Sequence, residues 1–385
     1  MLLLKKLSFL NQRHHILFLS SWYPSRVLPN NGDFVQRHAE AVATKHQVTL
    51  IHVISDENLA APIEITENNI NDVRTLIAYV KVSSNPIIKL YRFFSAYLNL
   101  IKRVGKFDLT HLNVIYPVGL IALYLKWFKK KPFIVSEHWH KYHKPFCNAF
   151  KFWEKSIIKL VAKNASHICP VTNNLGDAMK NFGVKNNYTK VPNVVDTNIF
   201  KPKEKIHKTF NIIHISSMDV VKNVSEILKV ISKINAKKID FKFFLIGENA
   251  NDFKSLSDKL TINSKNIFFI NQLPQQDLVT YLQQANVLVL FSTIENSPCV
   301  ILEAFSCGIP VISTDVGGVS EHFPKDFGTL IPANDSNVLL DELIKNYESS
   351  KTVLKEDMHT YIEQNFSKKS VAKQFTKVYL SVLKK

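Results

Sequence analysis

Residues 291–311, FSTIENSPCVILEAFSCGIPV, predict a loop, a short helix and the start of a strand. The Asn-Ser pair at 296–297 is favourable for a helix N-cap, and Pro298 suits the first helical position because its missing N–H needs no partner there. Gly308 favours the end of the helix. We therefore predict a helix over 298–307, whose first N–H groups are directed toward the loop and can bind a phosphate.

Apolar runs recur along the whole chain on both sides of this segment. They are nearly continuous in Val, Ile, Leu and Phe, which is typical of strands buried in a parallel sheet. Helical patterns such as residues 34–45 and 150–163 separate them, so the sequence predicts an α/β fold. The predicted strands are HILFLS (15–20), VTLIHVI (48–54), LTHLNVI (109–115), FIVSEH (133–138), HICPVT (167–172), NIIHISS (211–217), FKFFLIG (241–247), NIFFIN (266–271), NVLVLFS (286–292) and PVISTD (310–315).

The length of 385 residues fits two domains rather than one. The pattern of strands and helices restarts after residues 192–204, so we expect an N-terminal domain over 1–196 and a C-terminal domain over 197–365. We expect the remaining segment, 366–385, to pack back toward the N-terminal domain. Within it, Lys368–Lys385 reads as one amphipathic helix, with these residues on its apolar side: Val371, Phe375, Val378, Tyr379 and Val382.

Composition limits the class of protein. A hydrophobic content of 46% with 11% aromatic residues excludes a disordered or fibrous chain. The four cysteines form no CxxC pair, which favours a reducing, cytoplasmic compartment. Residues 1–15 contain no convincing secretory signal, and the uncharged run 109–125 is interrupted by polar residues and Pro117. We expect no spanning helix.

Charge is distributed unevenly. Residues 1–196 contain 26 Lys+Arg and 12 Asp+Glu, or +14, whereas the remaining residues contain 23 and 20, or +3. An anionic partner of the first half is indicated: nucleic acid, an anionic bilayer or a phosphorylated acceptor. Cations and aromatic residues alternate over Lys89–Lys106 and Lys126–Lys131, which is the composition of a helix at a bilayer surface. A core helix with a solvated basic edge fits equally well, and peripheral placement at the inner face of the cytoplasmic membrane stays an expectation.

Two glutamates flank the start of the predicted helix. Glu295 lies where the preceding strand ends, and Glu303 lies on the helix opposite an apolar stripe of Val300, Ile301, Ala304 and Phe305. Ligands of open α/β sheets bind beyond the carboxyl ends of the strands. The two carboxylates are therefore placed to flank a ligand with a central phosphate and hydroxyl-rich ends, such as a nucleotide-sugar. Solvated surface glutamates are the plainer alternative.

The segment ENSPCVILEAFSCGIPVISTDVGGVSE (295–321) resembles the E-x7-E signature of retaining glycosyltransferases with the GT-B fold, specifically the large family four. WYPSRVLPNNGDFVQRHAEAV (22–42) resembles its first glycine-containing loop and helix, and PNVVDTNIFKP (192–202) resembles the entry to its second domain. The resemblance covers most of residues 15–385. It implies an α/β fold of the GT-B type, with two Rossmann-like domains whose parallel sheets face a central cleft.

The resemblance also implies roles for individual residues. Glu303 is expected to bind the ribose hydroxyls and Glu295 to face the hexose. Gly32 would let its loop approach the diphosphate, and His138 would reach the donor sugar. The implied catalytic residues are thus Glu295 and His138, and the implied donor-binding residues are Gly32, Lys222, Asn296, Ser297, Pro298, Cys299, Val300 and Glu303.

The chain departs from the family pattern at one position. Family members carry an arginine five residues before the lysine that binds the diphosphate, but here Ser217 precedes Lys222. The last arginine of the chain is Arg103, so the second domain contains none. Lys222 would then act as a point charge without the two-pronged hydrogen bonding of a guanidinium.

Taken with the resemblance, these features imply a retaining hexosyltransferase that uses a nucleotide-diphosphate sugar, most commonly a UDP-sugar in this family. The acceptor would be a glycan or a lipid-linked molecule in cell-surface polysaccharide or lipopolysaccharide synthesis. No cofactor and no metal site are expected, since HExxH and clustered Asp pairs are absent from the sequence. The alternatives are a degenerate domain that binds nucleotide-sugars without catalysis and an epimerase of the same fold. The positive charge of the first half would also favour nucleic-acid binding, but the sequence contains no recognisable nucleic-acid-binding module.

Overall fold

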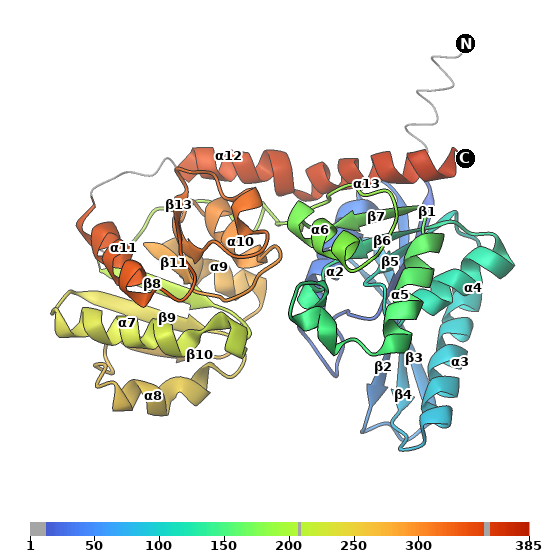
Figure 1. Cartoon of the computed structure of the whole chain (residues 1–385), viewed down its shortest axis with the longest axis horizontal. Helices are drawn as coiled ribbons and strands as arrows, with labels where there is room; N and C mark the ends of the chain where they lie inside the picture. The colour runs from blue at the N-terminus through green and yellow to red at the C-terminus, as the bar shows by residue number, and fades with distance from the viewer. Residues whose placement is uncertain (1–12, 207–208, 350–354, 385) are drawn as a thin grey trace, which may run out of the picture. The chain divides into compact units, whose positions relative to one another are not determined.

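The computed structural model describes residues 13–206, 209–349 and 355–384, and the chain forms two compact units (Figure 1). The first unit comprises Met1–Val194 together with Lys368–Lys385, and the second comprises Val195–Ser367. Both boundaries lie two residues from those expected from the sequence, after 196 and after 365. Within the described residues, no helix has the length and apolar character needed to cross a bilayer.

The first unit is built on a seven-stranded sheet with the order β3-β4-β2-β1-β5-β6-β7. All neighbouring strands are parallel except β3 and β4, which form an antiparallel pair at one edge. In the centre, Leu17 of β1 lies opposite Thr49 of β2 and Thr110 of β5. The strands are β1 (His15–Ser20), β2 (Gln47–Asp56), β3 (Ile63–Ile70), β4 (Val73–Lys81), β5 (Leu109–Asn113), β6 (Phe133–Glu137) and β7 (His167–Pro170).

The pair β3 and β4 was not among the predicted strands. Asn71 and Asp72 turn the chain between them with φ values of 47° and 64°, the left-handed conformation that Asn and Asp tolerate. Strand β3 is half-buried at best and half polar because it is the sheet edge. An edge strand lacks the continuous apolar run by which the other strands were recognised.

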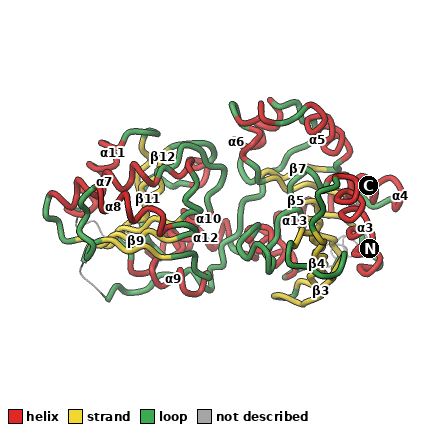
Figure 2. The backbone as a smooth tube through the Cα atoms, turned by 90° about the horizontal axis from the view of Figure 1, so that it is seen from below, coloured by secondary structure: helices red, strands yellow, loops and turns green. Residues whose placement is uncertain are grey.

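Helices cover both faces of the first sheet (Figure 2). One apolar core joins α3, α4, α5 and α6 to one face, and a second core joins α2 and α13 to the other. Alternate residues of each strand point into one core or the other; Leu17 and Leu19 of β1 belong to the first and Phe18 to the second. The helices are α2 (Asp33–Ala43), α3 (Pro86–Val104), α4 (Gly119–Lys129), α5 (Phe152–Asn164), α6 (Asn173–Asn181) and α13 (Lys368–Leu383), with single turns η1 (His140–Tyr142) and η2 (Phe146–Ala149).

The C-terminal helix α13 packs against α2 in the first unit. All five residues predicted for its apolar side are buried, so that prediction is confirmed. Polar contacts add to the packing: His111 Nδ1 lies 2.7 Å from the Tyr379 hydroxyl, and His46 Nε2 lies 2.9 Å from the Thr376 hydroxyl. The last helix of the chain therefore completes the N-terminal unit.

The second unit contains a six-stranded, wholly parallel sheet with the order β10-β9-β8-β11-β12-β13. Helices α7 and α11 pack on one face, and α9, α10 and α12 pack on the other. Its strands are β8 (Phe210–Ile215), β9 (Phe241–Ile246), β10 (Ile267–Ile270), β11 (Val287–Leu290), β12 (Val311–Thr314) and β13 (Gly328–Ile331). Its helices are α7 (Val224–Ala236), α8 (Lys254–Lys259), α9 (Gln275–Gln284), α10 (Cys299–Ser306), α11 (Ser336–Glu348) and α12 (Lys355–Phe366), with single turns η3 (Val220–Lys222), η4 (Ala250–Phe253) and η5 (Val319–His322).

The strand order reverses once in each unit. The chain leaves β8 for β9 on one side, and β11 lies on the other side of β8, so the loops after β8 and β11 diverge at the carboxyl edge. The same arrangement holds for β1, whose neighbours are β2 and β5. Ligands of open α/β sheets bind at such points, where the strand order reverses.

Candidate functional site

In the second unit the loops after β8 and β11 are joined side by side. Thr293 N–H donates to the carbonyl of Val221 at 2.8 Å. Beside this link, Lys222 Nζ lies 2.5 Å from Glu295 Oε1, which also accepts the Ser292 hydroxyl at 2.8 Å. The side chains of Lys222 and Glu295 are 18% and 9% exposed. Two residues assigned to the same ligand from the sequence are thus in direct contact.

Helix α10 begins beside this pair and differs at both ends from the predicted helix over 298–307. Pro298 has ψ of 116°, so it is extended and the helix begins at Cys299. The prediction that Asn296 or Ser297 caps the helix is wrong, because the cap position is Pro298 and makes no side-chain hydrogen bond. The two residues are instead buried in the loop. Gly308, with φ of 71°, follows the helix end in the left-handed conformation predicted for it.

Glu303 was predicted to lie on the polar side of the helix, clear of the core, and that prediction is wrong. Its exposed fraction is only 3%. The reason is that α10 is enclosed on nearly all sides: every residue from Ile301 to Ser306 is buried. The start of the helix is more open, since Pro298, Cys299 and Val300 are partly exposed. A carboxylate at the depth of Glu303 belongs to the fixed interior of the site rather than to its solvated rim.

A glycine after β12 holds the backbone of Glu295 in place. Gly317 has φ of 59°, and a Cβ built on it would lie 1.7 Å from the carbonyl oxygen of Glu295. The next residue, Gly318, donates its N–H to the same oxygen at 3.4 Å. Only glycine fits at position 317, because it tolerates the left-handed conformation and has no Cβ to collide. We had assigned no role to this glycine pair from the sequence.

The position of the family's arginine carries no positive charge. The Ser217 hydroxyl donates to Asp219 Oδ2 at 2.6 Å, and both residues are exposed. His214 of β8 holds this loop in place, because its Nε2 lies 2.8 Å from the Ser216 hydroxyl. Burial lowers the pKa of His214 to about 4, so its ring is neutral at neutral pH. This loop therefore presents a hydroxyl bonded to the carboxylate of Asp219 where a guanidinium was expected.

In the first unit, Gly32 lies at the N-cap of α2 with φ of 76°. A Cβ at this position would lie 2.4 Å from the carbonyl carbon of Trp22. Within the loop after β1, the backbone at Gly32 therefore packs directly against the backbone at Trp22. This close approach requires glycine at position 32 whether or not a ligand binds. The role implied for Gly32 in diphosphate binding stays a prediction.

His138 follows β6 and lies among aromatic rings. Its ring centroid is 4.4 Å from that of Phe34 and 5.3 Å from that of His38. Burial first, then the charges of His38 and His111, hold the pKa of His138 well below its ordinary range. Both ring nitrogens are buried, so the ring is neutral and enclosed in this structure. The predicted approach of His138 to a donor sugar is not tested by these contacts.

Glu137, the residue before His138, organises the same edge and had been interpreted only as part of a strand. Its carboxylate accepts the N–H groups of His138, Trp139 and Ile115 at 2.9, 3.1 and 3.1 Å, and the Tyr142 hydroxyl at 3.2 Å. The side chain is fully buried, and burial raises its pKa. Glu137 therefore ties the loop after β5 to the loop after β6. A carboxylate at the end of an apolar strand run was the available signal.

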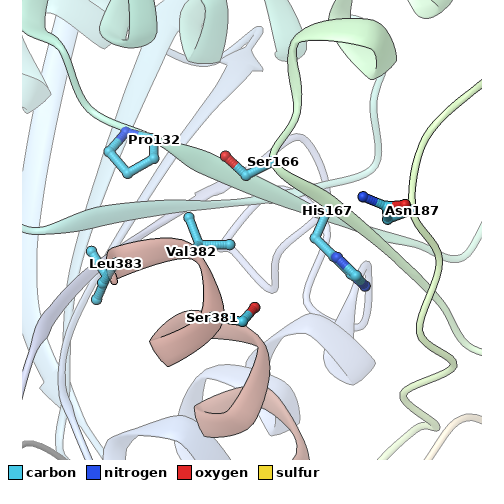
Figure 3. Close-up of a pocket in the computed structure, with 7 residues that line it drawn as sticks. All are labelled: Pro132, Ser166, His167, Asn187, Ser381, Val382 and Leu383. Atoms are coloured by element: carbon cyan, nitrogen blue, oxygen red, sulfur yellow. The ribbon is translucent and has the colours of Figure 1, made fainter. Parts of the chain in front are cut away.

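A cavity of about 570 Å³ opens elsewhere in the first unit (Figure 3). It lies at the amino ends of β6 and β7, the edge opposite Glu137, and the end of α13 closes one side. Its lining is Pro132, Ser166, His167, Asn187, Ser381, Val382 and Leu383. None of the predicted site residues contributes to it.

Comparisons with known proteins agree with this geometry. A family described as "Glycosyltransferase Family 4" matches residues 33–199, and one described as "Glycosyl transferases group 1" matches residues 195–366. The second match contains the Lys222–Glu295 pair and α10. The first contains Glu137 and His138 and begins one residue after Gly32.

Two curated relatives illustrate the range of similarity. N-acetyl-alpha-D-glucosaminyl L-malate synthase of Bacillus anthracis is 28% identical over 179 residues, or 45% of this chain and 46% of that protein. The chain thus matches about half the length of this relative. The putative teichuronic acid biosynthesis glycosyltransferase TuaC of Bacillus subtilis is 23% identical over 404 residues, covering 96% of this chain and 99% of that protein.

Solved structures share the fold at low sequence identity. Sucrose-phosphate synthase from Thermosynechococcus elongatus has a TM-score of 0.79 and 17% identity, covering 97% of this chain and 100% of that one. HepE of Anabaena in complex with UDP-glucose has a TM-score of 0.75 and 13% identity, covering 96% and 100%. The two family matches together extend over residues 33–366, and the chain belongs to the family 4 glycosyltransferases of the GT-B fold.

Proposed function

We propose that this glycosyltransferase transfers a hexose from a UDP-hexose with retention of configuration and without a metal ion. The observation that carries the proposal is the Lys222–Glu295 pair beside the N-terminus of α10. Lys222 supplies a positive charge for a diphosphate, and Glu295 supplies a carboxylate for sugar hydroxyls. The two groups sit within one hydrogen bond of each other, so one ligand that carries both a diphosphate and a sugar can engage both.

The departing diphosphate is where negative charge develops during transfer, and fixed positive groups there accelerate the reaction. In this proposal the negative charge on the diphosphate is stabilised by Lys222, by the backbone N–H groups of residues 296–300 and by the dipole of α10. The Ser217–Asp219 pair adds no positive charge, so Lys222 supplies a larger share of the stabilisation of the diphosphate than in relatives with an arginine. Glu303 binds the ribose from the buried side of α10.

Retention follows if the acceptor attacks on the face from which the diphosphate departs. The departing phosphate then takes the proton of the acceptor hydroxyl, and no protein base is needed for that step. Glu295 holds the hexose in the reactive pose. By the family pattern, His138 is assigned to the donor sugar and Gly32 to the approach of its loop to the diphosphate.

The choice of UDP-hexose and of acceptor draws on the relatives. HepE was solved with UDP-glucose, and TuaC is named for teichuronic acid biosynthesis. By this likeness the acceptor is a growing glycan or a lipid-linked precursor in the synthesis of a cell-surface polysaccharide.

Thermal stabilisation by UDP, GDP and ADP tests the donor site directly. We expect UDP to raise the melting temperature selectively and Lys222→Ala to weaken that shift. Lys229→Ala is the matched control, since Lys229 pairs with Glu226 at 2.6 Å on the exposed side of α7 and contributes nothing to the Lys222–Glu295 pair. No shift with any nucleotide would overturn the proposal and favour a domain that has lost its donor.

Turnover separates a transferase from a binding domain or an epimerase. A transferase releases UDP slowly from its UDP-hexose with water as acceptor, and release is faster with the correct acceptor. We expect this release to persist in EDTA. Conversion of the UDP-hexose to an isomer without UDP release would instead indicate an epimerase.

A further inference from the structure

The outer surface of α3, α4 and α5 concentrates exposed apolar side chains. These helices pack by their inner sides on the same core of the first unit, so they cover the same face of its sheet (Figure 1). Of the 17 large hydrophobic residues exposed in the described chain, ten belong to these three helices, whose solvent-exposed surface we call the α3–α5 face. They are Ile87, Ile88, Leu90, Tyr91, Leu98, Trp127, Phe128, Phe152, Trp153 and Leu160.

Helix α3 shows that this exposure is not a by-product of core packing. Ile87 and Tyr91 are 76% and 72% exposed and lie one turn apart, with Leu98 two turns further along the same side. The residues that α3 buries all lie between 96 and 104. The first half of the helix therefore presents apolar side chains to solvent, unlike a core helix whose exposed edge is only basic.

The neighbouring helices extend the surface with aromatic rings. Phe152 and Trp153, in the first turn of α5, are 84% and 55% exposed. Trp127 and Phe128, in the last turn of α4, are 45% and 71% exposed. The pair on α5 was not part of the segments singled out from the sequence. Aromatic rings with one polar or exposed end are typical of bilayer interfaces.

The charge of this face is almost entirely positive. Helices α3, α4 and α5 contain nine Lys and Arg residues and a single acid, Glu154. The imbalance extends to the whole unit: its residues include 32 Lys+Arg and 11 Asp+Glu, or +21, whereas the second unit has 17 and 21, or −4. The first unit exceeds the +14 counted from residues 1–196 because it includes the six lysines of residues 368–385 and leaves Asp196 to the second unit.

We propose that the α3–α5 face docks on an anionic lipid bilayer. The apolar side chains enter the head-group region, and the surrounding cations face lipid phosphates. A docking surface for a folded protein would have few charges among its apolar residues. Here cations and rings alternate over three helices, which is the composition of an interfacial membrane element. Docking needs no donor or acceptor, so it stands apart from the proposed transfer reaction.

Vesicle sedimentation tests the apolar part of this surface. The full chain is mixed, without nucleotide-sugar, with phosphatidylcholine vesicles that contain or lack phosphatidylglycerol. We expect the parent chain to bind only the anionic vesicles. For the double variant Ile87→Ser, Tyr91→Ser we expect the partition coefficient to fall by a factor of roughly ten or more. Ile206→Ser is the matched control, because Ile206 is also 76% exposed but belongs to the second unit. We expect it to bind like the parent chain.

Charge reversal tests the electrostatic part. Lys102→Glu with Lys129→Glu should lower the partition coefficient by roughly fivefold or more for each lysine. Lys254→Glu with Lys259→Glu makes the same change on α8 of the second unit and should have little effect. High salt should release the bound protein. Equal binding to neutral vesicles, no binding to anionic ones, or equal losses for test and control variants would overturn the proposal.

Discussion

Replacing Glu295 by Gln separates nucleotide binding from sugar transfer. In the structure Glu295 Oε1 accepts hydrogen bonds from Lys222 at 2.5 Å and from Ser292 at 2.8 Å. Gln keeps the shape and the bond from Ser292 but removes the negative charge. Lys222 is then released to pair with the diphosphate of UDP, and the repulsion between that diphosphate and Glu295 disappears.

The structure sets the size of the effect on UDP. A hydrogen bond to a charged group contributes about 1.5–3 kcal/mol, and we take the lower end because the two side chains are 9% and 18% exposed to screening solvent. A difference of about 1.4 kcal/mol is tenfold in affinity. We therefore expect Glu295→Gln to bind UDP roughly tenfold more tightly, measured by titration calorimetry.

Transfer should change in the opposite direction. If Glu295 holds the hexose, its loss should lower the rate of UDP release from the UDP-hexose by roughly 100-fold, the size typical of removing one electrostatic contact. Glu226→Gln is the matched control, because Glu226 pairs with Lys229 on the exposed side of α7 in the same unit. Weaker UDP binding by Glu295→Gln, or turnover equal to that of the control, would refute this reasoning.

Three further predictions concern the supports of the site and the stability of the fold. Gly317→Ala should lower the free energy of unfolding by about 2 kcal/mol or more and abolish the UDP shift, since its Cβ would collide with the Glu295 carbonyl; an unchanged melting curve would contradict this. Glu137→Gln should lower the free energy of unfolding by about 2 kcal/mol, because the NH₂ group of Gln would face a backbone N–H that donates to the carboxylate in the parent protein. Urea unfolding measures this difference, and equal free energies for the variant and the parent would contradict it. Burial holds the pKa of His38 and His52 at about 4, against an ordinary value of 6.5, so only the unfolded state takes up their protons between these values. The contribution of these two histidines to the free energy of unfolding should be fully present above pH 6.5 and should be lost as the pH drops toward 4. At pH 5 the loss should be about 2 kcal/mol per histidine. Equal midpoints of urea unfolding at pH 7 and pH 5 would contradict this.

Much of the fold was predictable because its strands are buried on both faces. A strand inside a parallel sheet must be apolar at nearly every position, so each of the ten predicted runs coincides with a strand. The final helix was predictable for a similar reason, since its apolar side repeats with the helical period. Strands β3, β4 and β13 were missed, and β3 is the clearest case because an edge strand has no such requirement.

The sequence by itself determined the parts of the site that depend on local order along the chain. The motif around α10 placed Glu295 before the helix and Glu303 within it, and it showed that Ser217 stands where an arginine is expected. These statements need only neighbouring residues and a family pattern.

Only the tertiary structure decided which of these groups meet and how deeply they lie. Lys222 and Glu295 are far apart in sequence but adjacent in space, because β8 and β11 are neighbours in the sheet. Glu303 is buried because α10 is enclosed on nearly all sides from Ile301 to Ser306, which its helical period could not reveal. Burial and pairing depend on segments distant in sequence, so composition and spacing leave them open until the strands are ordered into a sheet.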